Sequence, residues 1–221
     1  MSTSFPITER LPIGMLLAAN AGALDAYTYV AHGGVFAGLQ TGNMILMGVS
    51  AGQGNWRSFI AHLIPFLVFA VGTVIIRSLQ HALNTPEAKR RRAIIVLAIE
   101  AMMAVVTALV APYVSDTVTS SLVAIIAAAQ LQEFRRLRGK PYMSIMMTGN
   151  LRTTAEGFYD WLIRGDRKQL AAARDSGACI LALIIGATIS GLAAHLLGAI
   201  GILVAAPILL LAISYLWLAE A

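Results

Sequence analysis

The tripeptide Thr41-Gly42-Asn43 follows a long apolar segment, and the same tripeptide returns as Thr148-Gly149-Asn150 after another. Each copy interrupts apolar sequence at a place where a membrane helix would otherwise continue. A backbone break at membrane depth is tolerated only where protein or a water-filled cavity satisfies the freed polar groups. Two such breaks in corresponding places of two halves are typical of the solute pathways of transporters.

The sequence around the tripeptides indicates an internal repeat. A shift of 107 residues, which superimposes the tripeptides, places Asp25 over Gln132 without a gap. Further along, a shift of 114 residues pairs Gly72 with Gly186, and the seven additional residues fall in a charged loop, where insertions are tolerated. We therefore predict a single membrane domain over 1–221, built from two repeats at about 11–112 and 117–219.

The composition is that of a membrane protein. Of the 221 residues, 58% are hydrophobic and 12% charged, and the mean hydropathy is +0.75. Soluble domains carry about 25% charged residues. Apolar runs of about 20 residues recur from end to end, which indicates a polytopic helical protein. The net charge of +5 is therefore interpreted as membrane topology and attraction to lipid, and nucleic-acid binding is not expected.

Enzymatic and metal-site signals are lacking in the sequence. The single cysteine, Cys179, lies in an apolar run, and no cysteine–histidine cluster has metal-ligand spacing, so no metal or other cofactor is expected. The sequence also lacks a nucleophile with a nearby base and a nucleotide-binding loop, so we do not expect an enzyme. A cleaved signal peptide is disfavoured because the first apolar segment carries Asn20 and Asp25 and forms half of the repeat.

We expect six membrane spans and two shorter elements. Apolar runs of sufficient length predict the spans at 13–32, 57–82, 93–112, 117–134, 175–197 and 199–219. The tripeptide stretches, 35–53 and 142–163, are predicted to form re-entrant or interfacial helices. Arg152 and Glu156 argue against a full crossing of the second stretch, whereas the first is long enough to cross, and that alternative stays open.

Lys and Arg residues predict the orientation, because they remain in the cytoplasm when loops are short. The basic segment 89–92 joins the second and third spans, so this loop and both termini are expected to be cytoplasmic. Of the 16 Lys and Arg residues, 14 then lie on that side; Arg57 lies outside, and Arg77 snorkels from its span. Each half has an odd number of crossings. The sequence therefore predicts an all-α protein of two inverted three-helix repeats.

Asp25 is the strongest candidate for function. It lies well inside the first span, where a charge is costly unless it is paired or hydrated. Its counterpart in the repeat, Gln132, keeps the hydrogen-bonding capacity without the charge. Two interpretations remain open: a binding or coupling residue of a solute pathway, and a hydrogen-bonded carboxylate that ties helices together.

The tripeptides suit the start of a helix. Gly permits positive φ and ends a preceding helix, while Thr and Asn supply capping side chains. A helix beginning at Asn43 or Asn150 would direct its N–H groups at an anionic solute group, or at a carboxylate such as Asp25. A plain turn before a helix is the alternative. The predicted pathway residues in the two halves are Asp25, Thr41, Gly42, Asn43, Gln132, Thr148, Gly149 and Asn150.

Glu100 is a second intramembrane acid and completes the predicted pathway set. A pair with Arg77, a part in proton movement and a neutral hydrogen-bonded side chain all remain open. Glu133, beside Arg135 and Arg136, is predicted to form a solvated salt bridge. Low-specificity candidates for lining groups are Asn20, Gln40 and Gln130.

Small residues recur at four-residue intervals in the first span, from Gly14 to Ala26, and in the fourth, from Ser120 to Ala128. Such stripes let helix backbones approach closely, so we expect these two spans to cross near the centre. Similar pairs in the last two spans are interpreted as packing positions, with a homodimer interface as one role.

Three segments of the first half, Gly22-Ala-Leu-Asp25, Gly34-Val-Phe36 and Thr41-Gly42-Asn43, resemble the YoaK family, also called DUF1275. The second half is similar in Gln130-Leu-Gln-Glu-Phe-Arg-Arg136 and Met147-Thr-Gly-Asn-Leu-Arg152. The chain departs from the family pattern at Ala129, where Gly is common, and at Glu133, where a small amide is usual. The resemblance implies a bacterial inner-membrane protein and implies no activity, since the family has no established substrate.

The sequence thus predicts an inner-membrane protein that passes a small solute or ion, with the lipid bilayer as its surroundings. The alternative is a non-transporting membrane scaffold or accessory subunit.

Overall fold

The protein is all-α apart from one minimal hairpin. A computed structural model describes residues 5–83 and 85–218, without the side chains of 86 and 87. Eight α-helices follow in order: α1 (Leu11–Ala31), α2 (Gln40–Gly52), α3 (Trp56–Ala82), α4 (Pro86–Val110), α5 (Asp116–Glu133), α6 (Thr148–Arg164), α7 (Arg167–Leu197) and α8 (Ala205–Leu218). The remaining elements are the 3-10 helices η1 (Ile7–Glu9), η2 (Ala111–Tyr113) and η3 (Gly198–Val204), and the antiparallel strands β1 (Arg136–Leu137) and β2 (Lys140–Pro141).

Local sequence explains where several helices begin and end. The Asn55 side chain accepts a hydrogen bond from Ser58 N (3.1 Å) at the start of α3. Asp166 accepts hydrogen bonds from Lys168 N and Gln169 N at the start of α7. These are N-caps, which satisfy N–H groups that have no partner inside the helix. Helix α6 ends at Gly165, whose φ of +67° is the left-handed conformation that glycine adopts readily.

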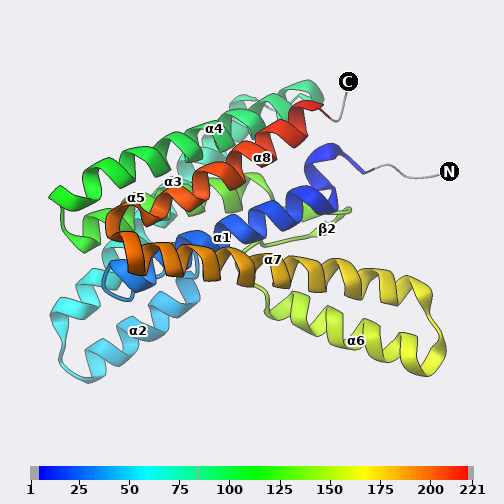
Figure 1. Ribbon diagram of the computed structural model, residues 1–221, viewed down its shortest axis with the longest axis horizontal. Coiled ribbons are helices and arrows are strands. Elements are labelled where there is room, and N and C mark those ends of the chain that lie inside the picture. Colours follow the sequence, from blue (N-terminus) through cyan, green and yellow to red (C-terminus); the bar gives the residue numbers. More distant parts are fainter. Residues whose placement is uncertain (1–4, 84, 219–221) are drawn as a thin grey trace.

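Helices α1, α3, α4, α5, α7 and α8 run along the long axis of the molecule, and α2 and α6 lie to one side of them (Figure 1). Helix α1 packs mainly against α7, α5 against α3, and α4 against α8. Both α2 and α6 begin near the middle of the long axis and run outward to opposite ends, where a turn leads into α3 and α7 respectively (Figure 1). The element order of the first half is therefore repeated in the second.

The core lies where the central helices α1 and α5 meet the helices around them. Its fully buried members include Leu17 and Leu24 of α1, Leu97 of α4, Ile126 of α5 and Leu209 of α8. Large apolar side chains also cover the outer faces of the peripheral helices, for example Leu67, Val71 and Val74 of α3 and Ile185 and Leu192 of α7. Apolar residues on both the inner and the outer face are typical of helices surrounded by lipid.

Three helical stretches of the described chain are long and apolar enough to cross a membrane: Trp56–Ala82, Ala88–Tyr113 and Arg167–Leu218. The last of these comprises α7, η3 and α8. The central helices α1 and α5 are rich in Ala and carry buried polar side chains, such as Asn20 and Gln130. The prediction of an all-α protein with membrane-type helices is confirmed at this level, while the six spans stay a prediction.

Several predicted boundaries differ from the observed ones. Helix α4 begins at Pro86 rather than 93, because Thr85 caps it through Ala88 N (3.2 Å), and α7 begins at Arg167 rather than 175. The predicted span 199–219 opens with η3, its α-helical part within the described residues is Ala205–Leu218, and position 219 lies outside them. Helix α2 begins at Gln40, three residues before Asn43. The predictions for α4 and α7 fell short because hydropathy identifies only the apolar part of a helix. In both helices, polar turns with an N-cap extend beyond that part.

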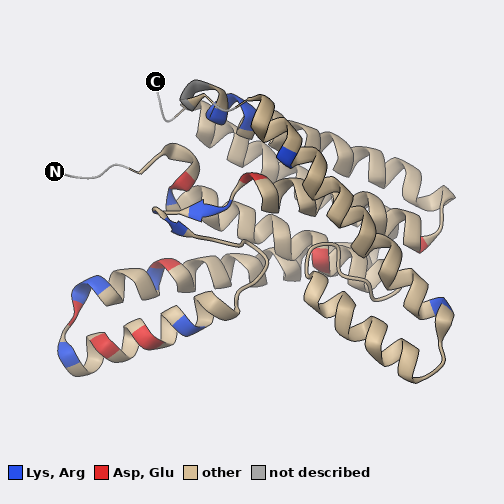
Figure 2. Cartoon of the chain, turned by 180° about the vertical axis from the view of Figure 1, so that it is seen from behind, with Lys and Arg blue, Asp and Glu red and all other residues tan. Residues whose placement is uncertain are grey.

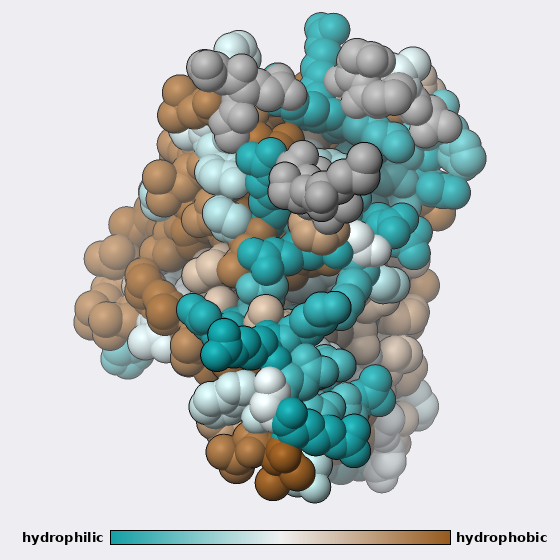
Figure 3. All heavy atoms as spheres, turned by 90° about the vertical axis from the view of Figure 1, so that its right-hand side faces the viewer, coloured by the Kyte–Doolittle hydropathy of each residue, from teal (hydrophilic) through white to brown (hydrophobic). Residues whose placement is uncertain are grey.

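Charged residues are unevenly distributed between the two ends of the molecule. Lys and Arg gather at the end that holds η1, the hairpin and the α6–α7 turn (Figure 2). We call this the basic end; its residues include Arg77, 89–92, 135–140 and 164–168. Viewed end-on, hydrophilic side chains gather across the middle of this face, with apolar side chains along one flank and at the lower edge (Figure 3). Arg57 and Asp116 lie at the opposite end, close to the α2–α3 turn.

Glycines allow the backbones of α1 and α7 to touch. A Cβ placed on Gly22 would lie 2.2 Å from the Leu183 carbonyl oxygen, and one placed on Gly186 would lie 2.0 Å from the Ala19 carbonyl oxygen. In the other half, a Cβ on Gly72 of α3 would lie 3.1 Å from the Ala128 Cβ of α5. Helices α1 and α5 do meet in the core, as expected for the first and fourth spans, but these glycine contacts of α1 and α5 are made with α7 and α3. Each small-residue stripe packs against the third helix of the other half.

Replacement of Gly186 by Ala should weaken the α1–α7 contact. Its Cβ would overlap a backbone oxygen, so the helices must separate, and we expect the free energy of unfolding to fall by about 1–3 kcal/mol. Thermal unfolding of the purified protein in detergent measures this. Gly191→Ala in the same helix is the matched control, because its nearest neighbour, the Ala26 Cβ, lies 3.9 Å away. Equal stability of the two variants would contradict the packing described.

Candidate functional site

Asp25 is bound to the loop that leads into α2. Its Oδ1 accepts hydrogen bonds from Gly38 N (2.6 Å) and Leu39 N (3.4 Å), directly before the first residue of α2. A carboxylate in this position complements the partial positive charge of a helix N-terminus. The expected meeting of the first tripeptide helix with Asp25 is thus observed. The geometry is that of a carboxylate tying two elements together.

Asn43, the last residue of the first tripeptide, closes the same loop from the other side. Its buried side chain donates from Nδ2 to Phe36 O (2.7 Å) and accepts from Phe36 N (3.0 Å). The Phe36 ring covers Gly42, where an added Cβ would lie 2.8 Å from the ring, and Thr41 is exposed. The first tripeptide therefore satisfies backbone groups and provides space, and does not face an open cavity.

The second tripeptide has different surroundings. Thr148 and Gly149 are exposed, and a Cβ on Gly149 would meet nothing within 4 Å. Asn150 contacts Met147 Sδ at 2.8 Å from its Nδ2. Gln132, the counterpart of Asp25, lies elsewhere: its Nε2 donates to Gln80 Oε1 on α3 (2.9 Å). The predicted pathway residues of the second half thus do not reproduce the arrangement of Asp25 and Asn43.

Gln130 holds the loop before α6 and is more central than sequence reasoning indicated. It is fully buried, accepts from Asn20 Nδ2 (2.8 Å), and donates to Leu17 O (3.0 Å) and Ser144 Oγ (2.9 Å). These bonds connect α5 to α1 and to the chain just before the second tripeptide. In the sequence, an amide side chain inside an apolar run was the only indication that Gln130 has a role. Its partners could not be predicted, because they lie more than a hundred residues away or in an irregular loop.

Tyr142 adds a further bond between this loop and α1. Its hydroxyl donates to the Gly14 carbonyl oxygen (2.7 Å). Burial raises the pKa of the Tyr142 phenol above its ordinary value, and the neighbouring Cys179 contributes in the same direction. The phenol therefore stays protonated and continues to donate throughout the physiological pH range.

The two loops that precede the tripeptides meet in the middle of the molecule. A Cβ placed on Gly38 would lie 2.0 Å from Ile145 Cδ1 and 3.4 Å from the Ala127 Cβ. Gly38 and Ile145 are themselves counterparts under the shift of 107 residues that superimposes the tripeptides. Ile145 is buried, so apolar packing closes the centre between the two halves in this conformation.

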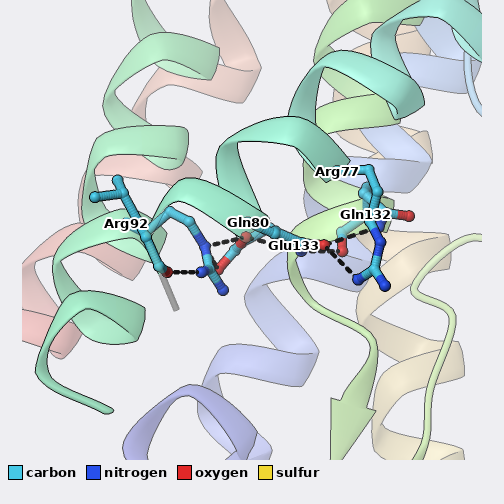
Figure 4. Close-up of polar contacts among 6 residues, drawn as sticks. Arg77, Gln80, Arg92, Gln132 and Glu133 are labelled. Atoms are coloured by element: carbon cyan, nitrogen blue, oxygen red, sulfur yellow. Dashed lines mark hydrogen bonds and ion pairs between the residues drawn. The ribbon is translucent and has the colours of Figure 1, made fainter. Parts of the chain in front are cut away.

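Glu133 forms a buried ion pair at the basic end. Its carboxylate accepts from Arg92 Nε at 3.0 and 2.9 Å, and only 8% and 4% of the two side chains are exposed (Figure 4). Arg92 also donates to the Leu83 carbonyl oxygen. The predicted solvated salt bridge of Glu133 with its sequence neighbours Arg135 and Arg136 is therefore wrong. The last turn of α5 faces α4 instead of solvent.

Gln80 of α3 connects this ion pair to Gln132. Its Nε2 donates to Gln132 O (2.8 Å) and to Glu133 Oε2 (3.1 Å), while its Oε1 accepts from Gln132 Nε2 (Figure 4). Arg77 Nη1 reaches the same Oε1 at 3.4 Å. The polar side chains of three helices thus converge near the surface of the basic end.

Glu100 is separate from both polar groups. The side chain is fully buried in α4, and neither carboxylate oxygen has a hydrogen-bond partner among the described residues. Of the three alternatives for Glu100, the pair with Arg77 is not formed, because Arg77 contacts Gln80 at the basic end. In the described chain no group of three or more His, Cys, Asp or Glu residues is arranged to hold a metal ion.

At the end opposite the basic one, a chain of hydrogen bonds leads inward from the surface. His32 Nδ1 contacts Asp116 Oδ1 (2.9 Å), and His32 Nε2 contacts the Tyr27 hydroxyl (2.8 Å). Tyr27 in turn donates to the Ala199 carbonyl oxygen (3.0 Å). The His32 side chain is buried. These bonds join α1, the start of α5 and the α7–α8 connection.

Hollows open at both ends of the molecule. One of about 480 Å³ lies at the basic end and includes Arg77, Lys89, Arg92, Glu133 and Arg135 in its lining. A neighbouring hollow of about 360 Å³ shares Arg77 and Arg135 with it and is also lined by Gln132. At the opposite end, a hollow of about 600 Å³ has His32, Asp116 and Arg57 in its lining. Asp25 and the tripeptides line none of the three.

Comparison with known proteins identifies the family. No curated protein and no solved structure matches the chain. Residues 13–216 match the family described as "Protein of unknown function (DUF1275)", which covers all eight α-helices in whole or in large part. The resemblance carried by the two tripeptide regions is thereby confirmed, and the chain belongs to the DUF1275 family.

Proposed function

We propose that this protein moves a small solute or ion across the bacterial inner membrane. The observation that carries the proposal is the central meeting of two loops, each of which leads into a short helix beginning at or next to a Thr-Gly-Asn tripeptide. Discontinuous helices whose N-termini point to the membrane centre are typical of solute sites in secondary transporters. The substrate is then expected to pass between Gly38 and Ile145, which now touch.

The arrangement of contacts supports two inverted repeats. Gly72 of α3 packs on α5, and its counterpart Gly186 of α7 packs on α1, so each half makes the same close contact with the other. Helices α1 and α5, the first of each half, run in opposite directions along the long axis (Figure 1). On this basis α1, α3, α4, α5, α7 and α8 are the six crossings, and α2 and α6 enter from opposite sides.

The distribution of charge supports an orientation with the basic end in the cytoplasm. Lys and Arg residues are retained there when loops are short. The hollows of about 480 and 600 Å³ at the two ends are then the cytoplasmic and external approaches to the closed centre. Passage requires the loops to separate, first towards one side and then towards the other.

A scaffold or accessory subunit is the second candidate, and specific contacts favour it. Asp25 and Asn43 are occupied by backbone hydrogen bonds, and the meeting point of the loops is filled by apolar side chains. This role would be supported if a membrane partner co-purified with the protein in stoichiometric amount and the protein showed no solute flux.

Replacement of Asp25 by Asn tests whether this carboxylate takes part in transport. Asn retains a side-chain oxygen that can accept from Gly38 N and Leu39 N, but it removes the charge from the centre. If the carboxylate binds or couples solute, the initial flux into liposomes should change about tenfold, the effect of one hydrogen bond to a charged group. Radiolabelled small solutes and ion-sensitive dyes report the flux. Unchanged flux in a normally folded variant would remove Asp25 from the mechanism.

Single cysteines in the two helical turns test the inverted topology. In a Cys179→Ala background, Gln53→Cys marks the α2–α3 turn and Lys168→Cys marks the α6–α7 turn, both at exposed positions. A membrane-impermeant maleimide should label the first in intact cells and the second only after permeabilisation. Labelling of both from the same side would contradict the inverted repeats.

A reversible cross-link tests whether the centre opens. Gly38→Cys combined with Ile145→Cys should form a disulfide, because Ile145 Cγ1 lies 3.2 Å from a Cβ built on Gly38. In the Cys179→Ala background, oxidation should abolish flux and reduction should restore it. The same oxidation of the Cys179→Ala protein is the control. Undiminished flux through the cross-linked protein would show that solute takes another route.

A further inference from the structure

The hollow of about 480 Å³ at the basic end has the size of a small-molecule site and an excess of positive charge. Five Lys and Arg residues and two Glu residues contribute to its lining, and they come from η1, α3, α4 and the α5–β1 segment. Cations from α3, α4 and the α5–β1 segment converge on one space here. A general enrichment of basic residues on a cytoplasmic surface does not require such convergence.

Ion pairing inside the hollow leaves three of these cations unmatched. Glu133 is engaged by Arg92 in the buried pair, and Glu9 lies 3.9 Å from Arg136. Among the described side chains, Arg77, Lys89 and Arg135 have no carboxylate partner. Arg77 makes only the long contact of 3.4 Å with Gln80, and all three side chains are exposed within the hollow's lining.

The three cations without a carboxylate partner favour a ligand with more than one negative charge. A single carboxylate would neutralise one of the three cations, whereas a phosphate group carries up to two charges and several oxygens that Arg binds through two parallel hydrogen bonds. Low-dielectric walls concentrate the potential of such a cleft and strengthen the attraction. From this geometry we infer that the hollow is a binding site for a phosphate-bearing anion, held by Arg77, Arg135 and Lys89.

The neighbouring hollow indicates two sources for that anion. It shares Arg77, His81 and Arg135 with the main hollow and opens beside Val74 on the apolar outer face of α3. A free phosphate compound would enter from the aqueous end face (Figure 3), whereas a phospholipid would place its headgroup on the arginines and its chains along α3. Both sources use the same cations. The site would bind such an anion whether or not the protein transports a solute.

The experiment uses the full chain purified in a non-ionic detergent. Inorganic pyrophosphate is titrated against potassium chloride of equal ionic strength, and thermal unfolding is followed by tryptophan fluorescence. The unmodified protein should show a saturable rise in melting temperature. Arg77→Gln and Arg135→Gln should each weaken the apparent affinity about tenfold, as expected for one charge-assisted hydrogen bond. Arg91→Gln is the matched control, because Arg91 is an exposed cation of the same end outside the hollow.

A second arm tests the lipid source. Native mass spectrometry of the protein in mixed micelles compares retention of phosphatidylglycerol with that of phosphatidylcholine, in the unmodified protein and the same three variants. Pyrophosphate binding that depends on Arg77 and Arg135 supports a soluble ligand. Selective retention of phosphatidylglycerol with the same dependence supports a lipid.

The inference is overturned if neither anion binds selectively, or if Arg91→Gln weakens binding as much as Arg77→Gln and Arg135→Gln do. Arg135→Lys retains the positive charge at this position. Anion binding that is lost in Arg135→Gln but kept in Arg135→Lys therefore comes from the charge and not from misfolding.

Discussion

Irregular backbone in the interior of a membrane-type protein must find hydrogen-bond partners within the chain, and this requirement organises the whole molecule. The loop between α1 and α2 is satisfied by the Asp25 carboxylate and the Asn43 amide. The chain between α5 and α6 is fixed to α1 by Gln130 and Tyr142. Different side chains thus hold the two loops in place. Once the loops are held in this way, the short helices that follow them can begin in the interior.

The same contacts limit what the protein can do. Because Gly38 and Ile145 fill the space between the two halves, the centre holds no open passage in this conformation, and the hollows lie at the ends. The Glu100 side chain is buried without a hydrogen-bond partner in the described chain. Such surroundings favour the neutral carboxylic acid over the charged carboxylate. A moving solute therefore depends on separation of the loops, whereas a scaffold would need no such movement.

Much of the helical architecture was predictable, because apolar runs and tripeptide breaks are local signals. The two short helices begin at Gln40 and Thr148, close to the tripeptides that predicted them. The positions of polar side chains were less predictable. Glu133 lies beside Arg135 and Arg136 in sequence, but the direction of the last α5 turn places it against Arg92. Similarly, a shift of 107 residues aligns Gln132 with Asp25, but Gln132 bonds to Gln80 of α3, whereas Asp25 bonds to the loop before α2.

The length of α7 has a consequence for how the protein sits in lipid. Its 31 residues extend about 46 Å at 1.5 Å per residue, well beyond a hydrocarbon layer of about 30 Å. The charged first turns, from Arg167 to Asp175, account for the excess. Helices usually accommodate thinner bilayers by tilting. Because α7 contacts the backbone of α1 at Gly22 and Gly186, we expect a tilt of α7 in a thinner bilayer to be transmitted to the helix that carries Asp25.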